Sequence, residues 1–177
     1  AFDTPLGAIP VDHEALAPLR DLPQVIVSDE AHAFEHSLEV QLPFLLQVLD
    51  RFTLAPLVVG RAAPAVVAEV LERLWGGAET LIVISSDLSH FLKYDQAQIK
   101  DRRTLQRIMA LDPGLDPDEA CGAMPVNGAL KAAAAHGLKP QLLGACNSGD
   151  TTGDHDRVVG YATLAFWAQI PEEHPHE

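Results

Sequence analysis

Leucines spaced three or four positions apart predict the first long helix of the chain, over residues 37–49. Five of them share one face of that helix, and Pro43 is expected to kink it. Further helices are predicted over residues 64–75, 96–109 and 125–136, and a short one near residues 12–20 interrupts a proline-rich, irregular start. Pro64 suits the first turn of a helix, and Gly137 is a natural stop after one.

Short apolar runs between these helices predict strands over residues 25–27, 53–59, 80–85, 141–145 and 158–167. The last run alternates only weakly, which is typical of a strand packed on both faces. Strands that alternate with helices indicate an α/β fold. We therefore predict a mixed, mostly parallel sheet sandwiched by helices, in a single domain over residues 1–177 with a frayed tail at residues 171–177.

The composition narrows the range of partners. The chain has 177 residues, 47% of them hydrophobic, which suits a folded domain and argues against disorder. Its 12 basic and 25 acidic residues give a net charge of −13, so we expect neither nucleic acid nor an anionic membrane surface as a partner. No apolar run approaches the length of a membrane span. The two cysteines stand in unlike contexts rather than in a disulfide framework, so we expect a reducing, cytoplasmic location.

Polar and titratable side chains follow directly on the predicted strand at residues 80–85. The run reads Ser85-Ser86-Asp87-Leu88-Ser89-His90. Open α/β sheets build their sites from side chains delivered at the carboxyl ends of strands. A carboxylate at Asp87 could orient the His90 imidazole and raise its basicity. The alternative is that Asp87 and Ser89 cap the next helix and that His90 is an incidental surface residue.

A second candidate segment lies at the start of the helix predicted over residues 37–49. His36 and Glu39 are three residues apart and can share one face of a helical turn. The alternative is that Ser37 caps this helix, with the neighbouring acidic residues placed favourably near its positive end.

Two further segments carry candidate chemistry. Cys121 is followed by glycine and precedes a predicted helix, an environment that suits a thiolate ligand or nucleophile. The alternative is a small buried hydrophobic residue. Residues 147–156 resemble a calcium loop in composition only, because the ligand spacing and the terminal glutamate are absent. This stretch is therefore expected to shape a cleft or to be a plain surface loop.

Five motifs occur together in the order typical of the Memo family, which in bacteria and archaea is called AmmeMemoRadiSam system protein B. The motifs are Glu35-His36-Ser37-Leu38-Glu39 with Leu42-Pro43, Ser85-Ser86-Asp87-Leu88-Ser89-His90, Cys121-Gly122, Asn147-Ser148-Gly149-Asp150 and Val159-Gly160-Tyr161-Ala162. The resemblance runs from about Asp3 to Phe166. Memo proteins in turn resemble the LigB-type (class III) extradiol dioxygenases, which use non-haem iron.

The resemblance implies a metal cleft, and this chain would hold only part of it. Family chains carry two histidine ligands in Pro-His-Ala-Gly and Ser-His-His stretches upstream of the point where this chain begins. Cys121 corresponds to the third ligand, where the dioxygenases have a glutamate. A thiolate with imidazoles suits iron, copper or zinc, and we expect weak metal binding or none in this chain alone. We also expect a fragment that lacks the first strands of its sheet and associates through an exposed sheet edge.

The roles carried over by the resemblance fall on four residues. His90 would be the acid–base group, His36 a polar wall of the cleft and Cys121 the metal ligand, while Asp87 would support them without binding the metal. The favoured function is a binding or scaffold protein with AMMECR1-type and radical-SAM partners, since a thiolate beside iron and oxygen is open to oxidation. The alternative is a metal-dependent redox enzyme or extradiol-type dioxygenase. A serine hydrolase is disfavoured, because no Gly-x-Ser-x-Gly elbow is present.

Overall fold

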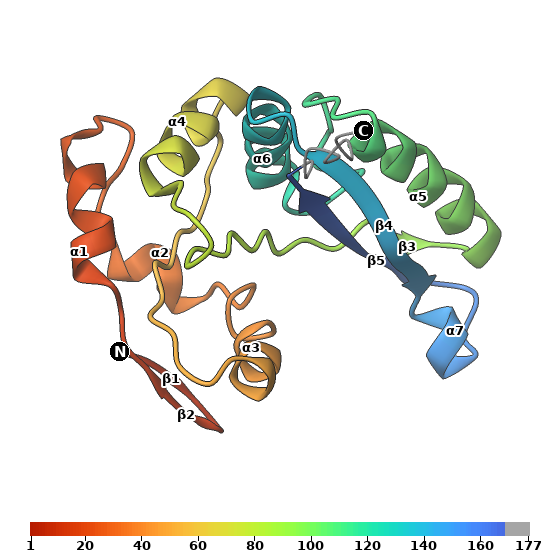
Figure 1. Ribbon diagram of the computed structural model, residues 1–177. Coiled ribbons are helices and arrows are strands. Elements are labelled where there is room, and N and C mark those ends of the chain that lie inside the picture. The colour runs from red at the N-terminus through yellow and green to blue at the C-terminus, as the bar shows by residue number, and fades with distance from the viewer. Residues whose placement is uncertain (169–177) are drawn as a thin grey trace, which may run out of the picture.

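A computed structural model of the chain describes residues 1–168 (Figure 1). Its elements in chain order are β1 (Phe2–Thr4), β2 (Gly7–Ile9), α1 (His13–Leu16), the 3₁₀ helix η1 (Ala17–Asp21), α2 (Asp29–Ala33), α3 (Leu42–Val48), α4 (Pro64–Leu74), β3 (His90–Leu92), α5 (Tyr94–Met109), α6 (Ala123–Ala135), β4 (Lys139–Asn147), α7 (Gly149–Thr152) and β5 (Val158–Trp167). The elements up to α3 lie on one side of the molecule, the sheet with α5 lies on the other, and α4 and α6 stand between them (Figure 1).

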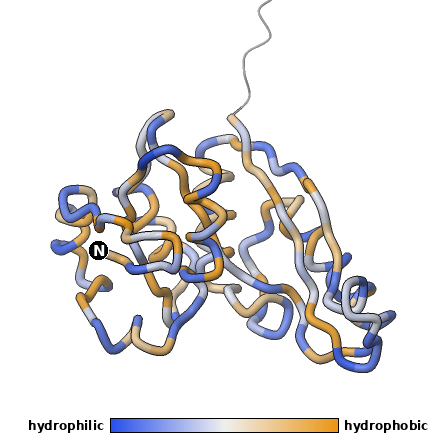
Figure 2. Tube along the Cα trace, turned by 90° about the horizontal axis from the view of Figure 1, so that it is seen from below, coloured by the Kyte–Doolittle hydropathy of each residue, from blue (hydrophilic) through white to orange (hydrophobic). Residues whose placement is uncertain are grey.

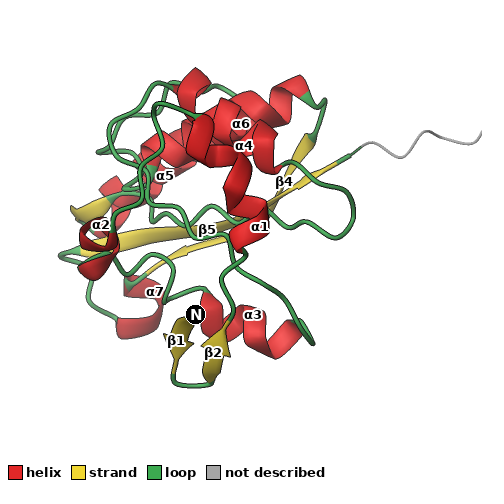
Figure 3. Ribbon diagram, turned by 90° about the vertical axis from the view of Figure 1, so that its left-hand side faces the viewer, coloured by secondary structure: helices red, strands yellow, loops and turns green. Residues whose placement is uncertain are grey.

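The main sheet has three antiparallel strands in the order β3-β5-β4. The long β4–β5 ladder runs from Lys139 opposite Trp167 to Asn147 opposite Gly160. Helices α4, α5 and α6 lie on one face of this sheet (Figure 3). Leu105 and Ile108 of α5 belong to the core on that side, against which Ala162, Leu164 and Phe166 of β5 pack. Alternate residues of β5 therefore face the helices.

Helices α4 and α6 pack closely because α6 carries a glycine at the point of contact. A Cβ atom built on Gly128 would collide with the Val67 side chain and lie 3.3 Å from the backbone nitrogen of Ala68. Val67, Ala68 and Leu71 of α4 form a buried cluster with Ala132 of α6. Small residues on α6 thus set the distance between the two helices.

Replacing Gly128 by alanine is expected to destabilise the chain by about 1–3 kcal/mol, the usual cost of an overpacked core. The higher helix propensity of alanine, worth about 1 kcal/mol, offsets only part of this cost, because the α4 backbone cannot give way cheaply. Urea unfolding would measure the difference. Gly144→Ala is the control, since a Cβ there meets nothing within 4 Å. A G128A variant at least as stable as the parent would contradict this packing.

Most of the predicted helices are confirmed. Helices α4, α5 and α6 coincide with the predicted ones to within two residues, and α1 with η1 fills the predicted short helix. The helix predicted over residues 37–49 is shorter, because α3 begins at Leu42. Proline has no N–H to donate and is tolerated in a first turn, so Pro43 starts the helix rather than kinking it. The two predicted strands after α6 are also present, as β4 and β5.

The predicted mostly parallel sheet is wrong, since both described sheets are antiparallel. The segments expected to supply the parallel strands, residues 25–27, 53–59 and 80–85, do not join a ladder. A lone parallel bridge joins Val11 to Leu54. An extended segment becomes a strand only when a neighbour pairs with its backbone over several residues. Within residues 1–168 the 53–59 segment pairs at Leu54 alone, and the other two segments join no ladder. The predicted frayed tail at residues 171–177 lies outside the described residues.

Two of these segments, residues 25–27 and 81–84, expose apolar side chains. Ile26 and Val27 are 80% and 88% exposed, and Leu81 and Val83 are 66% and 45% exposed. Between the latter two, Ile82 packs against the α4–α6 cluster. Residues 81–84 thus alternate as a half-buried strand does, with one covered and one open face. Figure 2 shows that hydrophobic positions recur along the loops as well as along the helices.

Candidate functional site

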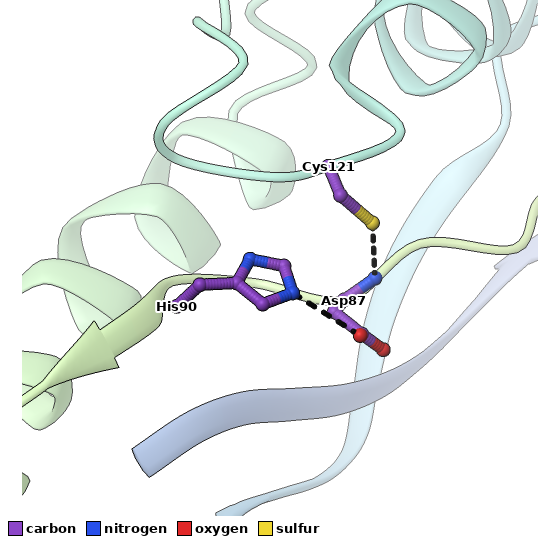
Figure 4. Close-up of side chains that lie close together, drawn as sticks. All are labelled: Asp87, His90 and Cys121. Atoms are coloured by element: carbon purple, nitrogen blue, oxygen red, sulfur yellow. Dashed lines mark hydrogen bonds and ion pairs between the residues drawn. The ribbon is translucent and has the colours of Figure 1, made fainter. Parts of the chain in front are cut away.

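Asp87, His90 and Cys121 bring a carboxylate, an imidazole and a thiol together. One ligand atom from each lies within 4.8 Å of the others. The His90 Nε2 atom lies 3.3 Å from Asp87 Oδ2, and the Cys121 sulfur faces the backbone nitrogen of Asp87 (Figure 4). Asp87 lies in the segment that leads into β3, His90 is the first residue of β3, and Cys121 comes from the turn before α6 (Figure 4). The cluster therefore joins two parts of the chain about 30 residues apart.

Leu88 and Ser89, which lie between Asp87 and His90, anchor this segment to the rest of the fold. Leu88 belongs to the hydrophobic core and Ser89 is fully buried. The Leu88 N–H donates to the Gly160 carbonyl and the Gly160 N–H donates to the Ser89 carbonyl, both at 2.9 Å. His90 itself pairs with Val159 of β5. The two titratable side chains are therefore presented by a fixed backbone.

Two reciprocal hydrogen bonds attach Cys121 to the same segment. The Cys121 N–H donates to the Asp87 carbonyl at 3.2 Å, and the Asp87 N–H donates to the Cys121 sulfur at 3.1 Å. The next residue, Gly122, donates its N–H to Ser86 Oγ at 2.9 Å. A Cβ on Gly122 would lie 2.8 Å from both the Ser85 carbonyl oxygen and the Ser86 Cβ. The glycine after the cysteine is therefore required for the close approach.

Positive ends of backbone dipoles surround the Cys121 sulfur. An N–H group points at the sulfur, and the residue immediately precedes the N-cap of α6, where the helix dipole is positive. Nearby, burial raises the pKa of Tyr161, and the charges of Asp87 and Cys146 raise it further. Cys121 is exposed, so its sulfur can be reached from solvent.

The donor set fits a borderline or soft transition metal. Thiolate and imidazole ligands suit iron, copper and zinc, whereas magnesium and calcium prefer oxygen ligands. Three protein ligands with an open position are what catalytic zinc sites use, and structural sites use four. The cluster is thus sufficient for an open site and insufficient for a closed one.

His36 lies on the surface in the segment between α2 and α3 and is not one of the three clustered ligands. The backbone N–H groups of His36 and Ser37 both donate to the Glu35 carboxylate at 2.8 Å. These two hydrogen bonds hold the pKa of Glu35 below its usual range, and the bond from Ser37 contributes most. Ser37 does not cap a helix here, because the N-cap of α3 is Gln41. The assignment of His36 to a cleft wall stays a prediction.

Residues 147–156 fold into a local structure built around α7. The Asp150 carboxylate accepts bonds from the Tyr94 hydroxyl at 2.5 Å and the Asn147 N–H at 2.8 Å, and the former contributes most to lowering the pKa of Asp150. Gly153 ends α7 in the left-handed conformation, at φ +76°. Within residues 1–168, the group of at least three His, Cys, Asp or Glu side chains that could hold a metal ion is formed by Asp87, His90 and Cys121. Residues 147–156 do not belong to this group.

Three residues that support the cluster were not predicted from the sequence. Gln41 donates its side-chain N–H to Ser85 Oγ at 3.1 Å and ties the segment after His36 to the site. Ser86 accepts the bond from Gly122, and Asp101 of α5 accepts one from the Ser89 N–H. The polar run at residues 85–90 could have pointed to Ser86. Nothing in the local sequence around Gln41 or Asp101 indicates such long-range partners.

Together, the fold and the cluster define a mixed α/β protein with a candidate transition-metal site. The chain belongs to the Memo-like protein family, whose profile matches residues 1–165. Among its relatives, the MEMO1 family protein of Ignicoccus hospitalis is 37% identical over 182 residues, and that of Sulfolobus acidocaldarius is 37% identical over 179. The MEMO1 family protein of Methanopyrus kandleri is 37% identical over 181 residues. The predicted resemblance to the Memo family is confirmed.

These alignments cover most of this chain and less of its relatives. They include 93% of this chain and 63% of the relative for the first two, and 94% and 64% for the third. The chain thus spans less than two thirds of the length of these relatives. No helix within residues 1–168 is both long and apolar enough to cross a membrane.

Proposed function

We propose that this chain carries part of a transition-metal site formed by Cys121, His90 and Asp87. The observation that supports it most is that one ligand atom from each side chain lies within 4.8 Å of the others. The thiolate and the imidazole would bind iron, copper or zinc. Asp87 would either fill a third ligand position or, at 3.3 Å from His90 Nε2, orient the ring.

The site in this chain alone would bind metal weakly. Metal affinity rises with the number of preorganised ligands, and three exposed or half-exposed groups are few. The relatives are longer, with about 63% of their length matched, and the Memo resemblance implies two histidine ligands in the additional part. A longer chain with those histidines would bind more tightly.

For the whole protein we favour binding or scaffolding over catalytic turnover. Cys121 is exposed, and a thiolate ligand beside iron and oxygen is open to oxidation, which makes repeated oxygen chemistry a poor match. The Memo resemblance implies a setting shared with AMMECR1-type and radical-SAM proteins, and we propose these as partners. A cytoplasmic location would accord with a reduced thiol at this position.

The Asp87–His90 pair favours a second candidate, a metal-dependent redox or extradiol-type enzyme. A carboxylate 3.3 Å from an imidazole can orient the ring and hold it in one tautomer. A bound metal would supply Lewis acidity and redox chemistry, while His90 would move a proton at its ring nitrogen. His36 would line the pocket in this reading, from its place on the surface segment before α3.

Titration of the purified chain with Zn²⁺ under reducing conditions tests the proposal. We expect one weak site per chain, lost when His90 and Cys121 are both replaced by alanine. Elemental analysis would measure the stoichiometry of iron, copper and zinc retained after purification. Zn²⁺ binding that is equal in the parent and the double variant would overturn the proposed site. Tight, stoichiometric metal in the parent would show that the ligands of this chain suffice.

A further inference from the structure

We propose that Asp101 is a positioning residue for the metal site, holding Asp87 and His90 in the arrangement that brings them to Cys121. This inference rests on the proposed metal-binding function. Asp101 lies on α5, away from the cluster in sequence, and would not touch the metal itself. Its effect would pass through Ser89, the residue that precedes His90 and lies two positions after Asp87.

The Asp101 carboxylate is buried against the segment that carries two of the three ligands. Asp101 is 8% exposed, and its Oδ1 atom accepts a hydrogen bond from the Ser89 N–H at 2.9 Å. Within residues 1–168 no cationic side chain forms an ion pair with this carboxylate. Within these residues, the hydrogen bond from the Ser89 N–H is therefore the polar contact that holds this carboxylate.

The second oxygen of the same carboxylate lies against β5. A Cβ atom built on Gly160 would collide with Asp101 Oδ2. Gly160 also donates its N–H to the Ser89 carbonyl and accepts from the Leu88 N–H, both at 2.9 Å. The ligand-bearing segment is thus held on one side by the backbone of β5 and on another by α5, and the two supports meet at Asp101 and Gly160.

Burial of a polar group is unfavourable unless it is hydrogen-bonded, and the Asp101 carboxylate and the Ser89 N–H satisfy one another. Removing Asp101 would leave the buried Ser89 N–H without an acceptor, which is unfavourable. The segment would shift to satisfy that group, and both flanking ligands would move with it. By contrast, the Ser89 hydroxyl is buried and has no hydrogen-bond partner among residues 1–168.

The test compares Zn²⁺ affinity, the absorption spectrum of bound Co²⁺ and unfolding temperature across four variants. Asp101→Ala should weaken Zn²⁺ binding about 10- to 100-fold, the usual effect of losing a group that orients a metal ligand, and should change the Co²⁺ spectrum. Asp101→Asn keeps an acceptor oxygen and should restore affinity to within about threefold of the parent. Ser89→Ala and Leu71→Ala are controls, and both should keep the parent affinity and spectrum.

The controls separate positioning from general destabilisation. Leu71 is buried in α4, in a cluster separate from the core around Leu88, so L71A should lower the unfolding temperature without changing the Co²⁺ spectrum. Parent affinity in folded D101A, or an equal loss in L71A, would overturn the inference and leave the metal site standing. A parent chain without the site would overturn both. If D101A does not fold, Gly160→Ala is the second variant, because its Cβ would press on the same carboxylate from β5. It should weaken Zn²⁺ binding likewise. Unchanged Zn²⁺ binding in G160A would count against the inference.

Discussion

Replacing Cys121 by serine is expected to weaken Zn²⁺ binding by about tenfold or more. Loss of a group that only orients a ligand already costs about 10- to 100-fold, and Cys121 would be a ligand itself. A serine hydroxyl is nearly the same size, but it stays protonated at neutral pH and is a poor partner for these metals. Competition titration with a chelator would measure the change. The same substitution in a full-length relative should also lower affinity.

Cys146 provides the matched control for this experiment. It is the second free and exposed cysteine of the chain, and it lies on β4 opposite Tyr161. Cys146→Ser should leave Zn²⁺ affinity unchanged, so a loss common to both serine variants would indicate nonspecific thiol binding. A C121S chain that binds as tightly as the parent would remove Cys121 from the proposed ligands.

The second large effect concerns association of the chain with itself. Residues 81–84 form an extended segment whose backbone makes no ladder and whose Leu81 and Val83 side chains are exposed. Unpaired backbone groups and an open apolar face favour pairing with another strand, and apolar burial contributes about 25 cal/mol per Å². We propose that a second copy of this chain pairs along this segment. Light scattering should therefore give a mass above that of the monomer, rising with concentration.

Polar substitution on the open face of the segment should reduce this association. Leu81→Thr with Val83→Thr keeps strand propensity and removes apolar surface, so the double variant should shift toward monomer. Ile99→Gln is the control, because Ile99 is also exposed and apolar but lies on helix α5. A parent chain that is monomeric at all concentrations and unfolds in one cooperative transition would contradict the proposed association.

The helices could be predicted from the sequence because their signals are local. Pro64 at a first turn and Gly137 after a last turn mark boundaries that the structure places within two residues of the prediction. The strand pattern at residues 80–85 was equally clear, yet no strand forms there. Strand formation depends on a partner elsewhere in space, and alternation of apolar residues says nothing about whether that partner is present.

The candidate site was likewise predictable from the sequence only in part. Asp87, His90 and Cys121 stood out as titratable residues in suggestive positions, and the structure places them together. Two of the groups that fix them, Asp101 and Gln41, could not be found, because they act across the fold. Asp101 is 12 residues from its partner Ser89 and Gln41 is 44 from Ser85. Their sequence neighbourhoods look like those of ordinary helical residues.

The backbone bond from Asp87 to the Cys121 sulfur would also act on the electronic properties of a bound metal. Hydrogen bonds to a ligating sulfur withdraw electron density and are one of the factors that set reduction potential in metal–thiolate centres. Here the donor is a main-chain N–H at 3.1 Å, which every residue except proline possesses. Changes to the Asp87 side chain would therefore alter the charge near His90 while leaving this tuning of the sulfur intact.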